Sequence, residues 1–367
     1  MKIPILSFYS GGGFLDIGFE MAGFNIIWTN EINEVIAKLH SAGITSWRKA
    51  RGNGIKAEIF NTKSIEKISS SEIISEAFKC ELPEVFGIIG GPPCQDFSTN
   101  GSNKGFTGAR GKMTIHFINK ILELLPTFFV MENVTGLLRI PAHKERLAEI
   151  IREIEMEYNV DYEILNAIEF GVPQFRERVF IIGIRKNKMN IESIDGKEKW
   201  FKWPYNLKYR DAIKRHTWPE AVEYGRRLSI PKCIPMELCI QSCLVPQSGV
   251  NKVANANEYF KLHKDHKELA KIKEGETNRP SFKRLHRFKY SPTACYGNNE
   301  VHLHPYMQRR LSVREALRIQ GVPDTYILPA DLPLSQKFKM IGNGVPIPLA
   351  KAVAEALHKY LCELLNI

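Results

Sequence analysis

The chain has 367 residues, of which 44% are hydrophobic, and a formal net charge of +11. The length predicts two domains, and the hydrophobic fraction is enough for packed cores and excludes an intrinsically disordered chain. The apolar start of the chain is too short for a signal peptide, and no run approaches the roughly 20 apolar residues of a membrane helix. The seven cysteines include no CxxC pair, which favours a reducing cytoplasm over a disulfide framework.

The first half of the chain alternates strand and helix patterns. Short apolar runs predict buried strands at Ile5–Phe8, Ile26–Trp28, Val85–Ile89, Phe128–Met131 and Val179–Ile184. Apolar residues recur at helical spacing in two stretches, one with Ile118, Ile121, Leu122 and Leu125 and one with Leu147, Ile150, Ile151 and Ile154. This alternation predicts an α/β fold with a mostly parallel sheet and helices on both faces.

A glycine cluster follows the first predicted strand. Ser10-Gly11-Gly12-Gly13 precedes a helical stretch, and glycines at this edge of a parallel sheet let the backbone approach a ligand closely. Glu31 ends the next strand about 20 residues on, the distance at which an acidic side chain can take ribose hydroxyls. The spacing is not G-x-G-x-x-G, so this combination indicates an adenosine ligand rather than a dinucleotide. A tight turn and a surface glutamate are the alternative.

Two reactive side chains come directly after later strands. Cys94 follows Gly90-Gly91-Pro92-Pro93, in which the prolines fix the backbone, and Glu132 follows the strand Phe128–Met131. Since parallel strands end at the same edge of a sheet, we expect the thiol and the carboxylate to lie near each other and near the glycine cluster. The alternative interpretation of Cys94, taken alone, is that it is a small buried residue that packs in a hydrophobic core.

A pair of arginines precedes the last predicted strand of this half. Alternation in the segment Gln174–Arg178 places Gln174, Arg176 and Arg178 on one side of the chain. One thiol, one carboxylate and two guanidinium groups are therefore expected to converge beside the adenosine site.

The middle of the chain is basic and weakly periodic. Residues 185–283 contain 21 Lys or Arg and 12 Asp or Glu, so they carry +9 of the +11 net charge. The aromatic residues of this region include Trp200, Trp203, Trp218 and Tyr224. A basic region favours a polyanionic partner, and a solvated lysine-rich surface is the alternative.

Regular structure is predicted again near the C-terminus. Ser312-Val313-Arg314-Glu315 is a capping box that begins a helix, and Gly321 and Pro323 end it. A last helix after Pro348 places an apolar stripe on one side, formed by Leu349, Val353, Ala356, Leu357, Tyr360, Leu361 and Leu364. We expect this helix to pack against the first domain.

Six segments together resemble the DNA cytosine-5 methyltransferase family. They are Phe8–Gly18, Pro92–Gln95, Glu132–Val134, Gln174–Arg178, Arg310–Asp324 and Gly342–Gly344. Each is a weak signal alone, but six in the family's order exclude chance. The resemblance implies a restriction-modification enzyme of bacterial or archaeal type, with a Rossmann-like methyltransferase fold.

The resemblance also implies a role for each reactive residue. Cys94 would add to carbon 6 of cytosine, which enables carbon 5 to attack the methyl group. Glu132 would hold the amino group and protonate ring nitrogen 3, and Arg178 would hold the carbonyl oxygen. Arg176 would support the site or contact a phosphate, and a cationic neighbour would help to ionise the thiol. The base must leave the duplex, because carbon 6 is unreachable in the stack.

S-adenosylmethionine is the cofactor that the resemblance implies, and no metal is expected. The expected cofactor-binding residues are Tyr9, Ser10, Gly11, Gly12, Gly13, Glu31, Ile32, Ser64, Ile65, Pro93 and Asn343. Ile32 stands where the family often has an aromatic that stacks on adenine, and Ser64 stands where an acid usually reads the adenine amino group. The glycine-rich residues 98–112 correspond to the family's loop that closes over DNA.

The domain assignment follows the same correspondence. We expect residues 1–185 to form the catalytic and cofactor-binding domain and residues 186–335 a smaller, irregular target recognition domain and hinge, with the reader in about 186–282. Residues 336–367 are expected to return to the first domain. The expected partners are double-stranded DNA and a cognate restriction endonuclease that acts on the same site without direct contact. The chain is expected to be a monomer, cytoplasmic and associated with the nucleoid, and not bound to a membrane.

Three alternatives remain at this point. Some relatives of the family act on tRNA, although a large basic middle region favours DNA. An inactive DNA-binding relative is disfavoured because Cys94, Glu132, Arg176 and Arg178 are all present. A nicotinamide oxidoreductase is the most distant alternative.

Overall fold

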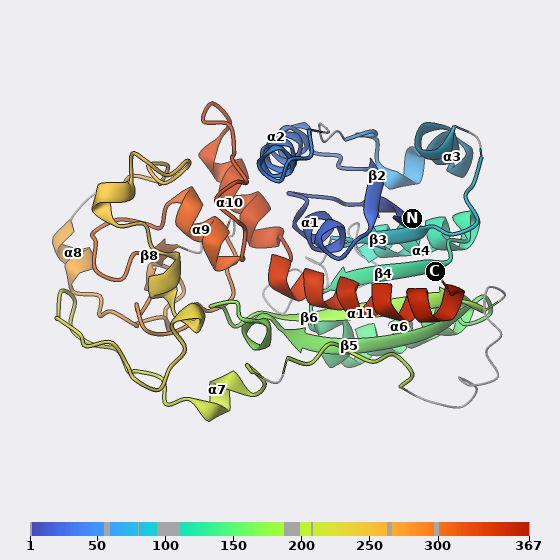
Figure 1. The fold of residues 1–367 in the computed structure, drawn as a ribbon. Helices are drawn as coiled ribbons and strands as arrows, with labels where there is room; N and C mark the ends of the chain where they lie inside the picture. The colour runs from blue at the N-terminus through green and yellow to red at the C-terminus, as the bar shows by residue number, and fades with distance from the viewer. Residues whose placement is uncertain are drawn as a thin grey trace.

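The structure is a computed structural model that describes residues 2–54, 59–79, 81–93, 111–186, 199–206, 208–262, 266–296 and 301–366. A lobe built on one sheet lies to the right in Figure 1, and a less regular lobe lies to the left. The elements of the sheet lobe are β1 (Pro4–Phe8), α1 (Phe14–Met21), β2 (Asn25–Thr29), α2 (Glu34–Ala50), α3 (Ser70–Phe78), β3 (Gly87–Gly90), α4 (Gly111–Leu124), β4 (Phe128–Asn133), α5 (Gly136–Arg139), α6 (Pro141–Ile154), β5 (Tyr158–Asn166), β6 (Glu177–Arg185) and α11 (Ile347–Leu365).

The sheet is mostly parallel, as predicted. Its strand order is β2-β1-β3-β4-β6-β5, and β6 runs in the direction opposite to that of the other five strands. The reversal of β6 was not predicted, and neither was β5. The strand β5 is an edge strand in which polar residues such as Asn159, Asp161 and Glu163 interrupt the apolar ones, so no apolar run marks it.

Helices cover both faces of the sheet, as predicted. Successive residues of β4 point to opposite faces: Phe128 and Val130 pack in one hydrophobic core, and Phe129 and Met131 pack in the other. The first core also contains residues of α1 and α11, and the second contains residues of α3, α4 and α6. The predicted last helix is therefore confirmed, and it lies along the sheet in Figure 1.

The second lobe has short elements joined by long irregular segments. Its helices and strands are α7 (Ala212–Arg215), α8 (His266–Ala270), β7 (Lys283–Arg284) and β8 (His302–Leu303), and α9 (Val313–Ile319) and α10 (Leu334–Asn343) lie between the lobes (Figure 1). Five 3₁₀ turns complete the described elements of the chain: Ile65–Lys67, Ala167–Phe170, Met236–Leu238, Ile240–Cys243 and Gln247–Gly249.

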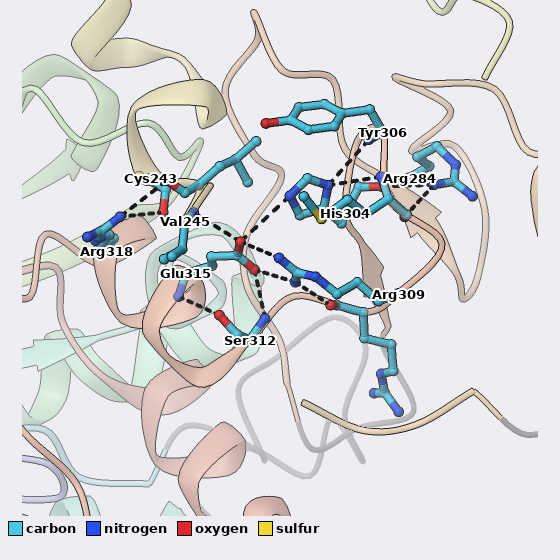
Figure 2. A network of polar contacts seen from close by, with 12 residues as sticks. Cys243, Val245, Arg284, His304, Tyr306, Arg309, Ser312, Glu315 and Arg318 are labelled. Atoms are coloured by element: carbon cyan, nitrogen blue, oxygen red, sulfur yellow. Dashed lines mark hydrogen bonds and ion pairs between the residues drawn. The ribbon is translucent and has the colours of Figure 1, made fainter. Parts of the chain in front are cut away.

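The predicted capping box at α9 is confirmed, and it anchors a buried polar network (Figure 2). Glu315 accepts hydrogen bonds from both terminal nitrogens of Arg309, at 2.7 Å each, and from the backbone N–H of Ser312 and Val245. His304 lies 3.6 Å from the same carboxylate. Because Val245 and His304 belong to the irregular lobe, the network fixes that lobe to α9. Gly321, at φ +71°, lies just beyond the end of this helix, as predicted.

The first aromatic residues of the basic middle region pack with the sheet lobe. Phe201 and Trp203 are buried in the core that contains α11, and Trp200 packs against it. The Asp161 carboxylate on β5 accepts the backbone N–H groups of Trp200 and Phe201, at 2.9 Å each. Trp200 and Trp203 therefore pack with the sheet lobe, although they belong to the segment that the sequence assigned to the target recognition domain. Among the described residues, no helix has the length and apolar character needed to cross a membrane.

Candidate active site

The glycine cluster forms a tight turn between β1 and α1. Tyr9, Gly11 and Gly13 have φ values of +53°, +52° and +74°, in the left-handed region that glycine adopts most readily. A Cβ on Gly13 would also lie 2.3 Å from Ile44 Cδ1, so a larger residue there would have to displace the Ile44 side chain. Ser10 lies at the same turn, where its hydroxyl donates to the backbone carbonyl of Ser7 at 3.1 Å.

Glu31 lies beside this turn rather than on a remote surface. Its two carboxylate oxygens accept the backbone N–H groups of Gly11 at 3.1 Å and Asn33 at 2.8 Å. Burial raises the pKa of Glu31, and the two backbone hydrogen bonds partly offset that rise. The structure thus brings together the two features that indicated an adenosine ligand.

The other predicted cofactor residues differ widely in burial. Ile32 is 61% exposed, whereas Ile65 is buried in the core that contains residues of α3, α4 and α6. Ser64 is half-buried at the start of a 3₁₀ turn, and its side chain makes no capping hydrogen bond there. Asn343 is exposed and is the last residue of α10. Met340, three residues earlier in the same helix, would meet a Cβ on Gly12 at 2.9 Å.

A buried polar cluster of Ser7, Asp16 and His40 contacts the turn at the Gly11 carbonyl, and the sequence analysis did not predict it. Asp16 accepts a hydrogen bond from the Ser7 hydroxyl at 2.6 Å, and its other oxygen lies 4.0 Å from His40 Nε2. His40 Nδ1 is 3.2 Å from the carbonyl oxygen of Gly11, which can only accept, so Nδ1 carries a proton. Burial raises the pKa of Asp16 to about 7 and lowers that of His40 to about 4.

Glu132 and Arg178 meet at the carboxyl end of β4. Glu132 is in the last part of that strand and Arg178 is near the start of the antiparallel β6, which places the carboxylate Oε1 2.9 Å from the guanidinium Nε. Burial raises the pKa of Glu132, and the positive charges of Arg178 and Arg176 oppose that rise. The pair therefore combines a carboxyl group that protonates more readily than usual with a fixed cationic donor.

The segment that leads to Cys94 lies against this pair. Asn133 Nδ2 donates to the Pro92 carbonyl at 3.4 Å, and a Cβ on Gly91 would lie 3.0 Å from Glu132 Oε2. Pro93 is half-buried. Cys94 and residues 98–110 of the predicted DNA-closing loop lie outside the described residues.

Arg176, the other guanidinium expected in the site, is more deeply buried than Arg178. It precedes β6 and is fully buried, and its guanidinium donates to the carbonyls of Ala294, Gly342 and Gly344 at 2.8–3.1 Å. Gln174 is also fully buried, and it accepts the backbone N–H of Ala294 at 2.9 Å. These contacts link the segment before β6 to residues 294, 342 and 344.

The cysteines of the irregular lobe do not form a metal site in the described part of the chain. Burial raises the pKa of both the Cys239 and the Cys243 thiols, whereas Cys233 is exposed. Within the described ranges, no group of three or more His, Cys, Asp or Glu side chains could hold a metal ion.

Comparisons with known proteins agree with this arrangement. The chain matches the family model for C-5 cytosine-specific DNA methylase over residues 3–359. It is 40% identical over 365 residues to the type II methyltransferase M.NmeDI of Neisseria meningitidis serogroup C, with 98% of this chain and 84% of that protein covered. It is 33% identical over 380 residues to the type II methyltransferase M.MthTI of Methanothermobacter thermautotrophicus, with both chains fully covered.

Solved structures show the same fold. One is described as a DNA modification methyltransferase encoded within an E. coli prophage, with a TM-score of 0.67 and 23% identity. The Dnmt2 methyltransferase of S. pombe gives a TM-score of 0.59 at 16% identity. Both comparisons cover 100% of each chain, and at these identities they bear on the fold alone.

Proposed function

Because the chain belongs to the C-5 cytosine-specific DNA methylase family, we propose that Cys94, Glu132 and Arg178 carry out its reaction. The chain is a type II DNA (cytosine-5-)-methyltransferase of a restriction-modification system and uses S-adenosylmethionine. The observation that carries the residue assignment is the 2.9 Å pair between Glu132 and Arg178, beside the segment that leads to Cys94.

Glu132 and Arg178 suit the polar edge of a cytosine. A carboxyl group with a raised pKa can give a proton to ring nitrogen 3 and accept from the amino group, while the guanidinium donates to the carbonyl oxygen. Protonation withdraws electrons from carbon 6, where the Cys94 thiolate adds and forms a carbon–sulfur bond. Carbon 5 becomes nucleophilic as a result, and it would take the methyl group that S-adenosylmethionine supplies, with S-adenosylhomocysteine as the leaving group. Loss of the carbon 5 proton and expulsion of the thiolate then restore the aromatic ring and free Cys94.

The turn after β1 fits the adenosine end of S-adenosylmethionine, which supplies an electrophilic methyl group when it is bound. A Cβ on Gly11 would meet no described side chain within 4 Å, which suits a close approach by a ligand, and Glu31 lies beside it with a carboxylate fixed by two backbone hydrogen bonds. We assign Tyr9, Ser10, Ile32, Ser64, Ile65, Pro93 and Asn343 to the same site on the family correspondence.

The irregular lobe is proposed to read the DNA sequence. Three hydrophobic clusters contain residues between Tyr209 and Leu303, one of them together with Ile168, whereas Trp200, Phe201 and Trp203 pack in the core of the sheet lobe. We therefore place the reader within residues 207–304, later than the 186–282 that the sequence indicated, and keep residues 1–185 and 336–367 as parts of the catalytic domain. Its lysines and arginines would contact phosphates, and a few polar side chains would read base edges.

The partners of the enzyme follow from the same assignment. DNA is the substrate that the family implies. We propose that the chain acts as a monomer on double-stranded DNA in the cytoplasm, and that a cognate endonuclease cuts the same sequence without contacting it.

Bisulfite sequencing of DNA from cells that express the chain tests this function and reveals the target. We expect 5-methylcytosine at one recurring sequence, and none with Cys94→Ser, which leaves the cofactor site unchanged. A duplex with 5-fluorocytosine at the target should form a stable adduct only when Cys94 is present, because fluorine blocks the final elimination. Methylation of tRNA but not of DNA, or normal turnover by Cys94→Ser, would contradict the proposal.

A further inference from the structure

Tyr326 lies between α9 and α10 and contacts the turn at residues 9–13 after β1, called the cofactor turn below. Its hydroxyl donates a hydrogen bond to the carbonyl oxygen of Gly12 at 2.8 Å, and the two residues are 314 positions apart in the chain. The side chain is fully buried, and its ring meets that of Phe14 edge-on with 5.6 Å between centroids. A Cβ on Gly43 would lie 2.1 Å from the Tyr326 ring, so α2 is shaped to admit this tyrosine.

The backbone carbonyl of Tyr326 accepts a hydrogen bond from Arg314 of α9. Arg314, which is fully buried, donates to the carbonyl oxygens of Tyr326 at 2.7 Å, Pro323 at 3.1 Å and Ala254 at 2.9 Å. Ala254 belongs to the irregular lobe. A single guanidinium thus ties that lobe to the residue that contacts Gly12.

Asn255 makes a second connection between the same two segments. Its side chain accepts the Leu328 N–H at 3.0 Å and donates to the Leu328 carbonyl at 2.8 Å, a reciprocal pair two residues from Tyr326. Its own carbonyl accepts the Arg314 N–H at 3.1 Å, and the Glu258 carbonyl accepts the Val313 N–H at 2.8 Å. Residues 254–258 therefore cap the first turn of α9 and fasten residues 326–328 at once.

We propose that Tyr326 is a positioning residue for methyl transfer, which couples the DNA-reading lobe to the cofactor turn through residues 254–258 and α9. The inference rests on the proposed assignment of that lobe as the reader. Any rearrangement of residues 254–258 when DNA binds acts on the Tyr326 backbone, and the hydroxyl acts in turn on the Gly12 carbonyl. Because coupling between two binding sites is reciprocal, bound cofactor then strengthens DNA binding by the same factor as DNA strengthens cofactor binding.

A purely structural tyrosine would behave differently, and the chain provides a matched control. Tyr158 is also fully buried, and its hydroxyl donates to the Pro126 carbonyl at 3.0 Å. It lies on β5, away from the cofactor turn. Tyr326→Phe and Tyr158→Phe each remove one buried hydroxyl and one hydrogen bond to a carbonyl, so both should lower stability to a similar extent.

Calorimetric titration with S-adenosylhomocysteine tests the positioning role without DNA. Tyr326→Phe should raise its dissociation constant about two- to tenfold, the loss expected for one neutral hydrogen bond. Tyr158→Phe should leave the constant within about twofold of the parent, a change under the usual worth of one such bond. Equal dissociation constants for the two variants would overturn the assignment of Tyr326.

The coupling is tested by repeating the titration with a saturating duplex that carries the site found by bisulfite sequencing. The parent should bind S-adenosylhomocysteine about 5- to 150-fold more tightly with the duplex than without it. Asn255→Gly removes the side-chain pair but suits the φ of +62° at this position, so it should reduce that ratio towards one. Asn366→Gly, at φ +53° beyond α11, is the control that should keep it. A parent ratio of one, or an unchanged ratio in Asn255→Gly, would overturn the coupling.

Discussion

Glu132 and Arg178 form a pair with 2.9 Å between the carboxylate Oε1 and the guanidinium Nε, and both side chains are nine-tenths buried or close to it. The two residues come from antiparallel neighbours in an otherwise parallel sheet. The reversal of β6 brings the start of that strand to the carboxyl edge, so that an arginine near the start of β6 meets a carboxylate near the end of β4.

The first prediction concerns Glu132. Glu132→Gln keeps a hydrogen-bonding group of similar size but cannot transfer a proton, so single-turnover methylation should slow by about 10²–10⁴-fold. Because burial raises the pKa of Glu132, the parent rate should fall as pH rises through that pKa, and the variant should lack this decline. Glu177→Gln, which removes only the ion pair with Arg139, is the control and should stay within about twofold of the parent, as expected for an exposed pair worth little. Parent-like turnover by Glu132→Gln would exclude the proton transfer.

Glu31 is predicted to contribute to cofactor affinity. Glu31→Ala removes a charged acceptor beside Gly11, and a lost charge-assisted hydrogen bond typically costs about 1.5–3 kcal/mol, or roughly 10- to 150-fold in affinity. Calorimetry with S-adenosylmethionine measures the change, while the rate at saturating cofactor should change less. Glu34→Ala, on the exposed start of α2, is the control. An unchanged dissociation constant in Glu31→Ala would assign Glu31 to holding the turn alone.

Arg176 is predicted to stabilise the fold rather than to contact DNA. Arg176→Lys keeps the positive charge, but one ammonium cannot reach the three carbonyls that the guanidinium spans, so the free energy of unfolding should fall by about 3–5 kcal/mol. Urea denaturation measures this loss. Arg152→Lys, in which an exposed guanidinium donates to one carbonyl, should change stability by less than about 0.5 kcal/mol. A phosphate contact would instead appear as a change of about one unit in the salt dependence of DNA binding for a neutral Arg176 variant.

Asp16 is predicted to make stability depend on pH. Its pKa of about 7 in the folded chain exceeds the ordinary 3.8, so the stability that it contributes is present below pH 4 and lost as pH rises through 7. His40, with a lowered pKa of about 4, contributes stability that is present above pH 6.5 and lost as pH falls through 4. The two effects oppose each other in the same range.

The substitution Asp16→Asn separates the pH effect of Asp16 from that of His40. Relative to the parent, its free energy of unfolding should increase from pH 4 to pH 7, by a total on the order of 4 kcal/mol. Denaturation at several pH values measures the difference. Asp331→Asn, at an exposed position, should give a difference that does not vary with pH. A flat difference for Asp16→Asn as well would show that Asp16 is ionised in the fold.

The last prediction concerns the reader. Exchange of residues 207–304 for the matching segment of a relative with another target should change the sequence that is methylated and leave the reaction unchanged. Asn255 and Glu258 must be kept, because they fasten the lobe to α9 and to Leu328. Bisulfite sequencing identifies the new target, and the same chimera with Cys94→Ser is the control that should show no methylation. A chimera that folds and retains the original target would place specificity elsewhere.

The sequence alone determined the features that depend on neighbouring residues. The apolar runs predicted most of the sheet, Ser312 and Glu315 predicted the start of α9, and the glycine cluster with Glu31 indicated the adenosine site. These signals are local because a strand pattern, a capping box or a tight turn is completed within a few residues, or in register with an adjacent strand. The position of Glu132 at the carboxyl edge followed for the same reason.

Only the tertiary structure decided what distant residues do. Alternation placed Arg176 on the same side of the chain as Arg178, but it could not show that the Arg176 guanidinium donates to the buried carbonyls of residues 294, 342 and 344. The strand β5 has no apolar run because it is an edge strand, and the direction of β6 depends on its pairing with β4. Tyr326 shows the limit most clearly: its contact with Gly12 joins the two ends of the chain, and no local spacing encodes a hydrogen bond that exists only once both lobes have packed.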